Sequence, residues 1–248
     1  MTTTRTDVTR HFAARAATYD RSSAWCTDRE LGDVVREVAP VGPADRVLDV
    51  ACGTGLMSRL FKGRAAEVVG VDITPEMADQ AATHLDRLVI APAEVLPFED
   101  ASFDVVVCRQ GVQFMELPAA VEEMVRVVRP GGRVVLVNLC AYGPEDSAEY
   151  FEILRLRNPV RRHFFLPDDP GRLLRDAGCH EVVGHRYVSV EDVDVWSDNG
   201  AIAEERREAI REVYRSASAE FRARHAVRES DGRFVDHMLF VIAVGLKP

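Results

Sequence analysis

The sequence predicts an α/β fold built on a doubly wound parallel sheet. Between residues 46 and 138, short apolar runs alternate with helical stretches, and strands that alternate with helices form parallel crossovers. A glycine turn, Gly53-Thr54-Gly55, follows the first apolar run and opens a helical stretch. The chain has 248 residues, of which 47% are hydrophobic, so it is long enough to bury a large core. These observations indicate one globular domain with room for a cap.

Two helical patterns precede the sheet. The first runs from about Asp7 to Tyr19 and the second from about Ser22 to Val38, each with apolar residues at helical spacing. Pro40-Val41-Gly42-Pro43 then breaks the chain. We therefore expect residues 1–40 to form lid helices outside the sheet.

The central part of the chain, residues 41–140, supplies the first five strands of a nucleotide-binding core. The predicted strands are Arg46–Val50, Glu67–Val71, Arg87–Ala91, Phe103–Cys108 and Gly132–Asn138. The predicted helices are Leu56–Lys62, Pro75–Leu85 and Ala119–Val128, and Glu94–Ser102 shows only a turn or a short helix. Because parallel crossovers are right-handed, these helices should cover both faces of the sheet.

The pattern is looser in residues 141–248, where we expect the remaining strands and a helical substrate cap. The predicted elements are helices Glu145–Arg157, Asp168–Ala177 and Ala201–His225 and strands His180–Val190 and Arg233–Leu246. Asp231-Gly232 forms a turn before the last strand. The cap should be drawn from residues 140–165 and 192–228 of what is a single structural domain.

The glycine turn carries the strongest chemical signal. Glycine lets the backbone approach a ligand where a Cβ atom would collide, and the helix that follows presents free N–H groups. Asp72 ends the second predicted strand, 19 positions after Gly53, and an acid at that distance accepts hydrogen bonds from ribose hydroxyls. Nicotinamide dinucleotides and S-adenosylmethionine both contain that ribose, so the turn and Asp72 leave both cofactors open.

Two residues favour one of these cofactors. A dinucleotide site has a third glycine beside the pyrophosphate, and this chain has Ser58 there. Asp49 lies inside the strand just before the turn, where a carboxylate suits an ammonium group and a sulfonium but would repel a pyrophosphate. The sequence therefore favours S-adenosylmethionine over the alternative, a nicotinamide-dependent oxidoreductase, which competition by NAD would test.

Several stretches occur in a characteristic order: Val47–Gly55, Val71–Met77, Ala93–Phe98, Phe103–Val107 and Arg126–Gly132. Together they resemble the Rossmann-like (class I) S-adenosylmethionine-dependent methyltransferases, in particular the ubiquinone/menaquinone-biosynthesis type and its small-molecule (type 11) relatives. The resemblance covers about residues 44–140. It implies a doubly wound, mostly parallel seven-stranded sheet whose last strand is antiparallel, with N-terminal helices and a helical cap.

The resemblance also implies which residues hold the cofactor. They are Tyr19, Asp49, Ala51, Gly53, Gly55, Asp72, Ile73, Met77, Ala93, Glu94 and Arg109. Gly53 and Gly55 would line the methionine part with Asp49 and Ala51 nearby, and Arg109 would lie under it. Tyr19 resembles the lid tyrosine of relatives. Asp72 would bind ribose, and the remaining four would contact adenine. Relatives often have an acid where this chain has Pro92, which offers no side-chain acceptor, so Glu94 or a backbone carbonyl must substitute.

Methyl transfer is an in-line displacement, in which positioning alone can supply about 7–11 kcal/mol. A base is needed only when the acceptor is protonated and poorly acidic. On the acceptor side, Gln113 would orient an oxygen atom and His163 would act as the base. A backbone hydrogen bond for Gln113 and an exposed loop position for His163 stay open. We expect a small-molecule acceptor methylated on O, N or C, as in secondary metabolism; a non-methyl reaction such as cyclisation is the alternative.

The composition argues against several partners. A formal net charge of −9 and an isoelectric point near 5.3 disfavour nucleic acid. The five cysteines include no close pair, which favours a reducing compartment and argues against a metal site. The start of the chain lacks an apolar signal core, and no run approaches the ~20 apolar residues of a membrane span. We therefore expect a cytoplasmic monomer or homodimer that binds no metal.

Overall fold

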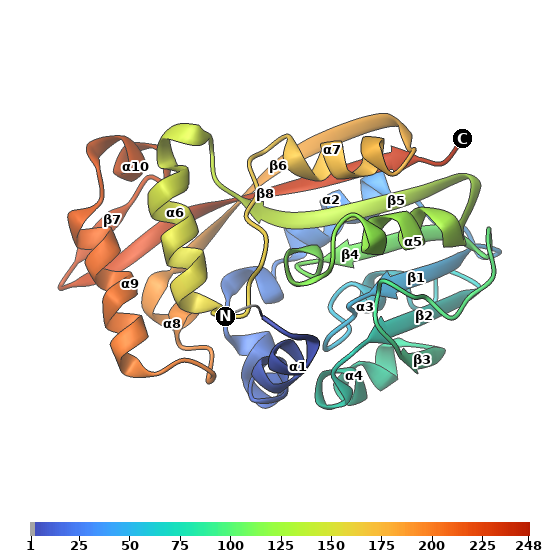
Figure 1. Ribbon diagram of the computed structural model, residues 1–248, viewed down its shortest axis with the longest axis horizontal. Coiled ribbons are helices and arrows are strands. Elements are labelled where there is room, and N and C mark those ends of the chain that lie inside the picture. The colour runs from blue at the N-terminus through green and yellow to red at the C-terminus, as the bar shows by residue number, and fades with distance from the viewer. Residues whose placement is uncertain (1–2) are drawn as a thin grey trace.

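The computed structural model describes residues 3–248 as a mixed sheet with helices packed against it (Figure 1). The sheet has eight strands in the order β3-β2-β1-β4-β5-β8-β6, and the short β7 pairs with β8. The strands are β1 Arg46–Val50, β2 Glu67–Asp72, β3 Arg87–Ile90, β4 Phe103–Arg109, β5 Val128–Cys140, β6 His180–Asp192, β7 Arg228–Ser230 and β8 Arg233–Leu246. The first five strands are parallel, whereas β8 is antiparallel to β5 and β6. The predicted fold class is confirmed.

Alternate residues of the central strand face opposite sides of the sheet. Val47 belongs to one buried apolar cluster, and Leu48 and Val50 belong to another. Because β1 is buried on both faces, its sequence is a nearly continuous apolar run. Asp49 is the polar exception, and only 1% of it is exposed.

The strand order reverses between β1 and β4, because the chain leaves β1 towards β2 on one side and later returns to β4 on the other. Open α/β sheets bind ligands outside the carboxyl ends of the strands at such a point. The loops after β1 and β4 meet there closely: a Cβ atom on Gly111 would lie 2.8 Å from the Cβ of Ala51. The topology therefore marks this edge as the place for a site.

The helices are of two kinds, α-helices and short 3-10 turns. The α-helices are α1 Arg5–Ala13, α2 Arg29–Val38, α3 Ser58–Phe61, α4 Pro75–Ala81, α5 Ala119–Val127, α6 Pro144–Arg157, α7 Asp169–Asp176, α8 Val193–Ser197, α9 Glu204–Ser216 and α10 Ala219–Arg224. Short 3-10 turns cover Ala16–Arg21, Ala24–Cys26, Ala82–His84 and Val112–Phe114. Helices α6, α8, α9 and α10 gather as a cap at one end of the molecule, and α1 lies between this cap and α4 (Figure 1).

Two of the predicted N-terminal helices are shorter than expected. The first, predicted to reach Tyr19, ends at Ala13 and continues as a 3-10 turn. The second begins at Arg29 rather than Ser22, because the side chain of Asp28 caps it by accepting from the N–H groups of Glu30 and Leu31. The helix predicted over residues 56–62 is likewise reduced to α3, four residues long.

The long helix predicted over residues 201–225 is in fact two helices. Ala217 leaves the helical conformation with ψ of 143°, and Ser218 starts α10 by accepting a hydrogen bond from the N–H of Phe221. A serine at this position competes for backbone groups, which favours a new N-cap over continuation. The sequence also missed β7, which forms a hairpin with β8 through the predicted Asp231-Gly232 turn. Within residues 3–248 no helix combines the length and apolar character needed to cross a bilayer.

Candidate functional site

The turn after β1 holds an acidic side chain at the carboxyl edge of the sheet. Ala51 and Gly53 both adopt the left-handed backbone conformation, with φ of 56° and 53°. The N–H of Gly53 donates to one carboxylate oxygen of Asp72 at 2.8 Å, and the N–H of Thr74 donates to the other at 2.8 Å. A carboxylate has about four acceptor positions, so Asp72 is fixed in orientation and still has lone pairs for a ligand.

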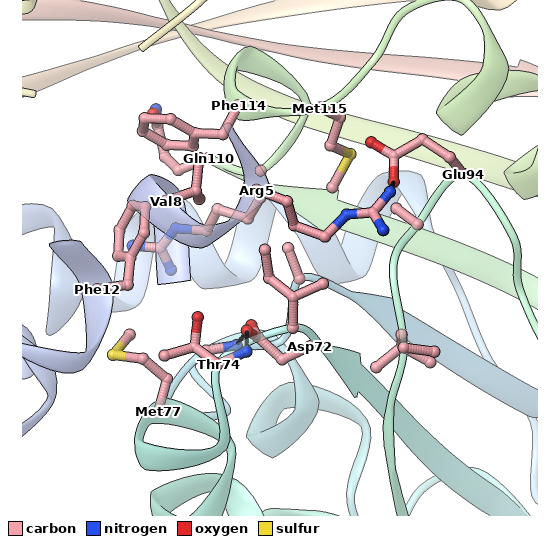
Figure 2. A pocket seen from close by; sticks show the side chains of 18 of the residues that line it. Arg5, Val8, Phe12, Asp72, Thr74, Met77, Glu94, Gln110, Phe114 and Met115 are labelled. Carbon is pink, nitrogen blue, oxygen red and sulfur yellow. Dashed lines mark hydrogen bonds and ion pairs between the residues drawn. The ribbon is translucent and has the colours of Figure 1, made fainter. Parts of the chain in front are cut away.

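A hollow that we call the main cavity lies over this turn (Figure 2). It holds about 900 Å³ of empty space, a volume that includes the solvent at its mouth. Figure 2 shows Asp72 and Met77 on one wall, with Val8 and Phe12 of α1 on the wall opposite. The N-terminal helix α1 therefore lies over the strand ends.

Polar contacts tie this N-terminal part of the chain to the rest of the cavity. The guanidinium of Arg5 lies 3.4 Å from Glu94, and Figure 2 shows its side chain reaching across the cavity. Arg162 pairs with Glu116 and also donates to the carbonyl oxygen of Thr3. Glu94 additionally accepts a hydrogen bond from the N–H of Glu116 at 2.8 Å. These contacts connect α1 to the loops beyond β3 and β4, although their partners are far apart in the sequence.

A smaller hollow, the strand-end cavity, adjoins the main cavity and has about 290 Å³ of empty space. The two cavities share Tyr19, Ala51, Gly53 and Arg109 as lining residues. Asp49 lines the strand-end cavity. The strand-end cavity therefore brings the Asp49 carboxylate and the Arg109 guanidinium into one space next to the glycine turn.

Burial dominates the electrostatics of these two groups. It raises the pKa of Asp49 to about 7, although a hydrogen bond from the Ser58 hydroxyl at 2.6 Å and the nearby Arg109 both oppose the shift. The Arg109 guanidinium lies over the Trp25 ring, 4.6 Å from its centroid, and donates to the Trp25 carbonyl. Its buried Nε atom has no hydrogen-bond partner among residues 3–248. The Arg109 guanidinium is thus incompletely satisfied by the described part of the protein.

A third hollow, the arginine cavity, has about 310 Å³ of empty space and lies between α1, the loop after β4 and the end of α6. Its charged lining residues are Arg15, Arg157 and Arg161. It shares Phe12, Tyr19, Gln110 and Phe114 with the main cavity. Tyr19 lines all three cavities and therefore marks the place where they meet.

The structure gathers most of the predicted cofactor residues around these hollows. Those that line the main cavity are Tyr19, Ala51, Gly53, Asp72, Ile73, Met77, Ala93, Glu94 and Arg109. Asp49 lines the strand-end cavity. Gly55 lines neither, because it faces α4 instead: a Cβ atom on it would lie 3.1 Å from Cα of Ala81. Its small size serves the packing of the turn on the helix.

The two residues predicted for the acceptor side are placed differently. Gln113 is buried and lines the arginine cavity. Its side chain donates to Gln110 at 2.8 Å and accepts from Asn138 at 2.7 Å. The Nε2 atom of His163 lies 3.0 Å from the carbonyl oxygen of Met115, so it must donate there, and His163 lines none of the three cavities. The structure therefore does not bring His163 to the site.

Sequence reasoning missed that Val8 and Phe12 line the main cavity, and it missed the charged lining of the arginine cavity. Val8 and Phe12 stand one helical turn apart, and this spacing marks an apolar helix face but not what covers it. Arg15 and Arg157 are separated by more than half of the chain, so no local signal joins them. The role of Ser58 was also missed, since its hydroxyl holds Asp49.

This geometry defines a class of protein: an α/β fold that holds a ribose-containing cofactor at the topological switch point, with a helix over it and a second cavity beside it. Residues 48–136 match the family model described as a methyltransferase domain. Over 178 residues the chain is 33% identical to malonyl-[acyl-carrier protein] O-methyltransferase of Serratia marcescens, covering 69% of this chain and 67% of that enzyme. The chain belongs to the S-adenosylmethionine-dependent methyltransferases.

Further comparisons agree on the fold. The chain is 33% identical over 159 residues to the uncharacterized methyltransferase YcgJ of Bacillus subtilis, covering 60% of this chain and 62% of YcgJ. The crystal structure of YcgJ matches with a TM-score of 0.82 at 23% identity, covering 89% of this chain and 99% of that one. The [4+2]-cyclase SpnF also shares the fold, with a TM-score of 0.59 and 21% identity over 88% of this chain and 81% of SpnF. The sequence matches to the Serratia marcescens enzyme and to YcgJ span 67% and 62% of those relatives' own length.

The cofactor of this family, S-adenosylmethionine, fits the residues present. The glycine turn provides a cradle that a side chain would narrow, since a Cβ atom on Gly53 would lie 3.3 Å from Met77. The buried Asp49 carboxylate suits an ammonium group, and the unpartnered Nε of Arg109 suits a carboxylate. The methionine end of the cofactor carries both of these groups.

Proposed function

We propose that this chain transfers a methyl group from S-adenosylmethionine to an oxygen, nitrogen or carbon atom of a small organic acceptor. The observation that carries the proposal is the junction at Tyr19, where the main, strand-end and arginine cavities meet. The main cavity suits the adenosine end of the cofactor, and the strand-end cavity suits its methionine end. The third lies next to them and would receive part of the acceptor.

Each cofactor residue has a role that follows from its position. Asp72 would accept hydrogen bonds from the ribose, because its carboxylate is oriented by two backbone N–H groups. Asp49 and Arg109 would hold the ammonium and carboxylate groups of the methionine part. Ile73 and Met77 would pack against adenine on the wall of the main cavity. Glu94 would contact the adenine edge and, through Arg5, hold the lid closed over it.

S-adenosylmethionine supplies a methyl carbon on a positively charged sulfur, which makes that carbon electrophilic. The chain must align the acceptor and keep water away. Phe12 and Phe114 pack edge to face with ring centroids 5.0 Å apart, and both line the main and arginine cavities. Burial raises the pKa of Tyr19, so its hydroxyl stays protonated and acts as a hydrogen-bond donor rather than a base. The reaction rests on positioning by these groups.

The roles of Gln113 and His163 remain predictions, and the geometry favours the role of Gln113 over that of His163. Gln113 lines the arginine cavity and also holds the amide of Gln110, so a Gln113→Ala enzyme should show a raised KM for the acceptor. His163 holds the loop of Met115 through its ring. If it were the base, His163→Ala would lose turnover with a changed pH profile, while cofactor affinity stayed constant.

Calorimetry with S-adenosylmethionine and S-adenosylhomocysteine tests the cofactor site. Asp72→Ala and Gly53→Val should each weaken binding by about tenfold or more, because a charge-assisted hydrogen bond is lost or the cradle is filled. Asp79→Ala, which removes an exposed acid of α4, is the matched control and should bind normally. Unchanged affinity in both test variants would refute the assigned site.

A screen of small-molecule extracts with methyl-labelled cofactor, followed by mass spectrometry, tests the reaction. One relative is named for O-methylation of malonyl-[acyl-carrier protein], so malonyl thioesters belong in the screen. Labelled product with release of S-adenosylhomocysteine supports methyl transfer. Acceptor conversion without that release would instead identify a non-methyl reaction such as cyclisation. Competition by NAD for the cofactor would reopen the oxidoreductase alternative.

A further inference from the structure

The arginine cavity contains an unusual concentration of buried positive charge. We call Arg15, Arg157 and Arg161 the arginine cluster; each is at most 6% exposed. Buried charges are normally paired with an opposite charge. Within residues 3–248, none of the three forms an ion pair with a carboxylate, and each donates to a neutral acceptor instead. The protein therefore leaves this positive charge uncompensated.

The neutral acceptors of the cluster are specific. Arg15 donates to the side-chain oxygen of Asn158 at 2.9 Å. Arg157 donates to the carbonyl of Trp196 at 2.8 Å, and Arg161 donates to a backbone carbonyl in the following loop at 2.8 Å. These bonds hold the side chains in place without cancelling their charge.

The titratable groups around the cluster do not cancel its charge either. His11 shares the oxygen of Asn158, and burial together with the charge of Arg15 lowers its pKa to about 4, so it is neutral. Glu191 is the carboxylate that acts on Arg157. Its oxygens accept from the N–H groups of residues 24 and 25 and from Ser189. Glu191 thus binds the N-terminal segment to β6 rather than pairing with an arginine.

Several buried donors of the same cavity have no acceptor. Within residues 3–248, the following atoms of lining residues lack a hydrogen-bond partner: Nε of Arg15, Nε1 of Trp25, Nε2 of Gln110, Nη2 of Arg161 and Nε1 of Trp196. All are N–H donors. Because buried donors are normally satisfied, a group rich in acceptor oxygens is the natural complement of this cavity.

Aromatic rings hold the guanidinium groups in fixed planes. The Cζ atoms of Arg15, Arg157 and Arg161 lie 4.9, 4.4 and 5.3 Å from the ring centroids of Tyr19, Trp196 and Phe164. Stacking on an aromatic face restricts a long side chain. Burial, and next the charge of Arg15, also lower the pKa of Arg157 to about 9. An anion in the cavity would relieve the repulsion between these guanidinium groups. Because the side chains are already held in place, its binding would cost little conformational entropy.

From these observations we propose that the arginine cavity binds an anionic group of the acceptor, a carboxylate or a phosphate, and that the arginine cluster determines specificity for it. The inference rests on the proposed methyl transfer, because the cavity meets the cofactor cavities at Tyr19. A carboxylate or phosphate offers the bidentate acceptor geometry that guanidinium groups prefer. The charged end of the acceptor is anchored, and its reacting atom extends to the junction.

Anion titration of the enzyme loaded with S-adenosylhomocysteine tests the proposal directly. Inorganic phosphate and malonate are titrated at constant ionic strength against chloride, with binding followed by calorimetry and thermal unfolding. The wild type should show saturable binding of at least one of the two anions, and which one binds distinguishes phosphate from carboxylate. Arg161→Met should weaken that binding by about tenfold or more. Arg161→Lys, which keeps the charge without the planar fork, should show an intermediate loss.

Arg155→Met is the matched control. Arg155 stacks on the same Phe164 ring, at 5.0 Å, but it is exposed and paired with Glu152, so its removal should leave anion binding unchanged. The proposal is overturned if neither anion binds the wild type better than chloride, or if Arg161→Met binds as the wild type does. It is also overturned if Arg161→Met loses S-adenosylmethionine affinity, because the cluster would then serve the cofactor.

A paired acceptor screen completes the test. Carboxylic acids are compared with their amides, and phosphate monoesters with the parent alcohols, using methyl-labelled cofactor. The wild type should methylate the charged member of a pair in preference to the neutral one, and Arg161→Met should lose that preference. Equal labelling of both members would refute anion recognition while leaving methyl transfer intact. Absence of label with every acceptor, together with no cofactor binding, would instead contradict the proposed function.

Discussion

Two groups of buried charged side chains lie at opposite ends of α6, and the protein satisfies them in different ways. At its N-terminal end, His225 lies between Asp146 and Asp236 at 3.0 and 2.8 Å, and the hydroxyl of Tyr214 donates to Asp236 at 2.6 Å. We call these four residues the histidine cluster. At the C-terminal end of α6, Arg157 and the rest of the arginine cluster have no carboxylate partner within residues 3–248.

The difference separates a structural network from a binding surface. The histidine cluster is fully buried, both of its carboxylates pair with His225, and none of its residues lines the three cavities. It joins α6, α9, the end of α10 and β8, and so holds the cap together. The arginine cluster lines a cavity and lacks counter-charges. A buried charge that the fold does not neutralise is a better guide to a ligand than a buried charge that it does.

The largest expected effect comes from breaking the histidine cluster. His225→Asn removes a buried cation and leaves two carboxylates facing each other without compensation. The free energy of unfolding, measured by urea denaturation, should fall by about 3–5 kcal/mol. His185→Asn, on the exposed part of β6, is the control and should change it by less than about 0.5 kcal/mol. A loss at His225 as small as the loss at His185 would contradict the role assigned to the cluster.

The pH dependence of stability should sharpen the same contrast. Burial opposes protonation of His225, but the hydrogen bonds and charges of Asp146 and Asp236 outweigh it and raise its pKa from 6.5 to about 9. A raised folded pKa stabilises the protein below the unfolded value of 6.5, and the stabilisation is lost as pH rises through about 9. The loss should approach about 3 kcal/mol. Urea denaturation across this range should show the decline in the wild type and its absence in His225→Asn.

Asp49 extends the comparison to the cofactor site, because it is a buried carboxylate with a hydroxyl partner and a pKa raised by burial to about 7. An ammonium group of the cofactor would favour the ionised form, so binding should release a proton. The Kd for S-adenosylhomocysteine should therefore rise by about eightfold as pH falls from about 7.5 to about 6. Calorimetry in buffers of different ionisation enthalpy would detect the proton. A flat Kd in the wild type would contradict an ammonium group at Asp49.

The smallest expected effect is the change in the stability of the protein when an arginine of the arginine cluster is replaced. Arg161→Met replaces a buried, unpaired cation with an apolar side chain of similar length, which is often neutral or stabilising. Its unfolding free energy should stay within about 1 kcal/mol of the wild type, or rise, even though anion binding is lost. A fall as large as that expected for His225→Asn would show that the arginine cluster is structural and would erase the contrast.

Local patterns predicted the half of the molecule that holds the cofactor. Strand β1, the glycine turn that follows it and the acid at the end of β2 are close in sequence. Burial on both faces of the sheet requires the apolar runs in which they are embedded. Their spacing alone therefore predicts that Asp72 lies beside Gly53, and a hydrogen bond of 2.8 Å connects them. Helix ends were less predictable, because caps such as Ser218 break a helix whose periodicity continues.

By itself, the sequence determined the fold class, the position of the glycine turn and the donor half of the site, because short-range periodicity and spacing encode them. Only the tertiary structure decided how the cap is held and where charge is left unpaired. The histidine cluster joins residues 146, 225 and 236, and the arginine cluster joins residues 15, 157 and 161. In the sequence these residues are ordinary charged residues. Whether the charge of each residue is compensated depends on which distant segment of the chain packs against it.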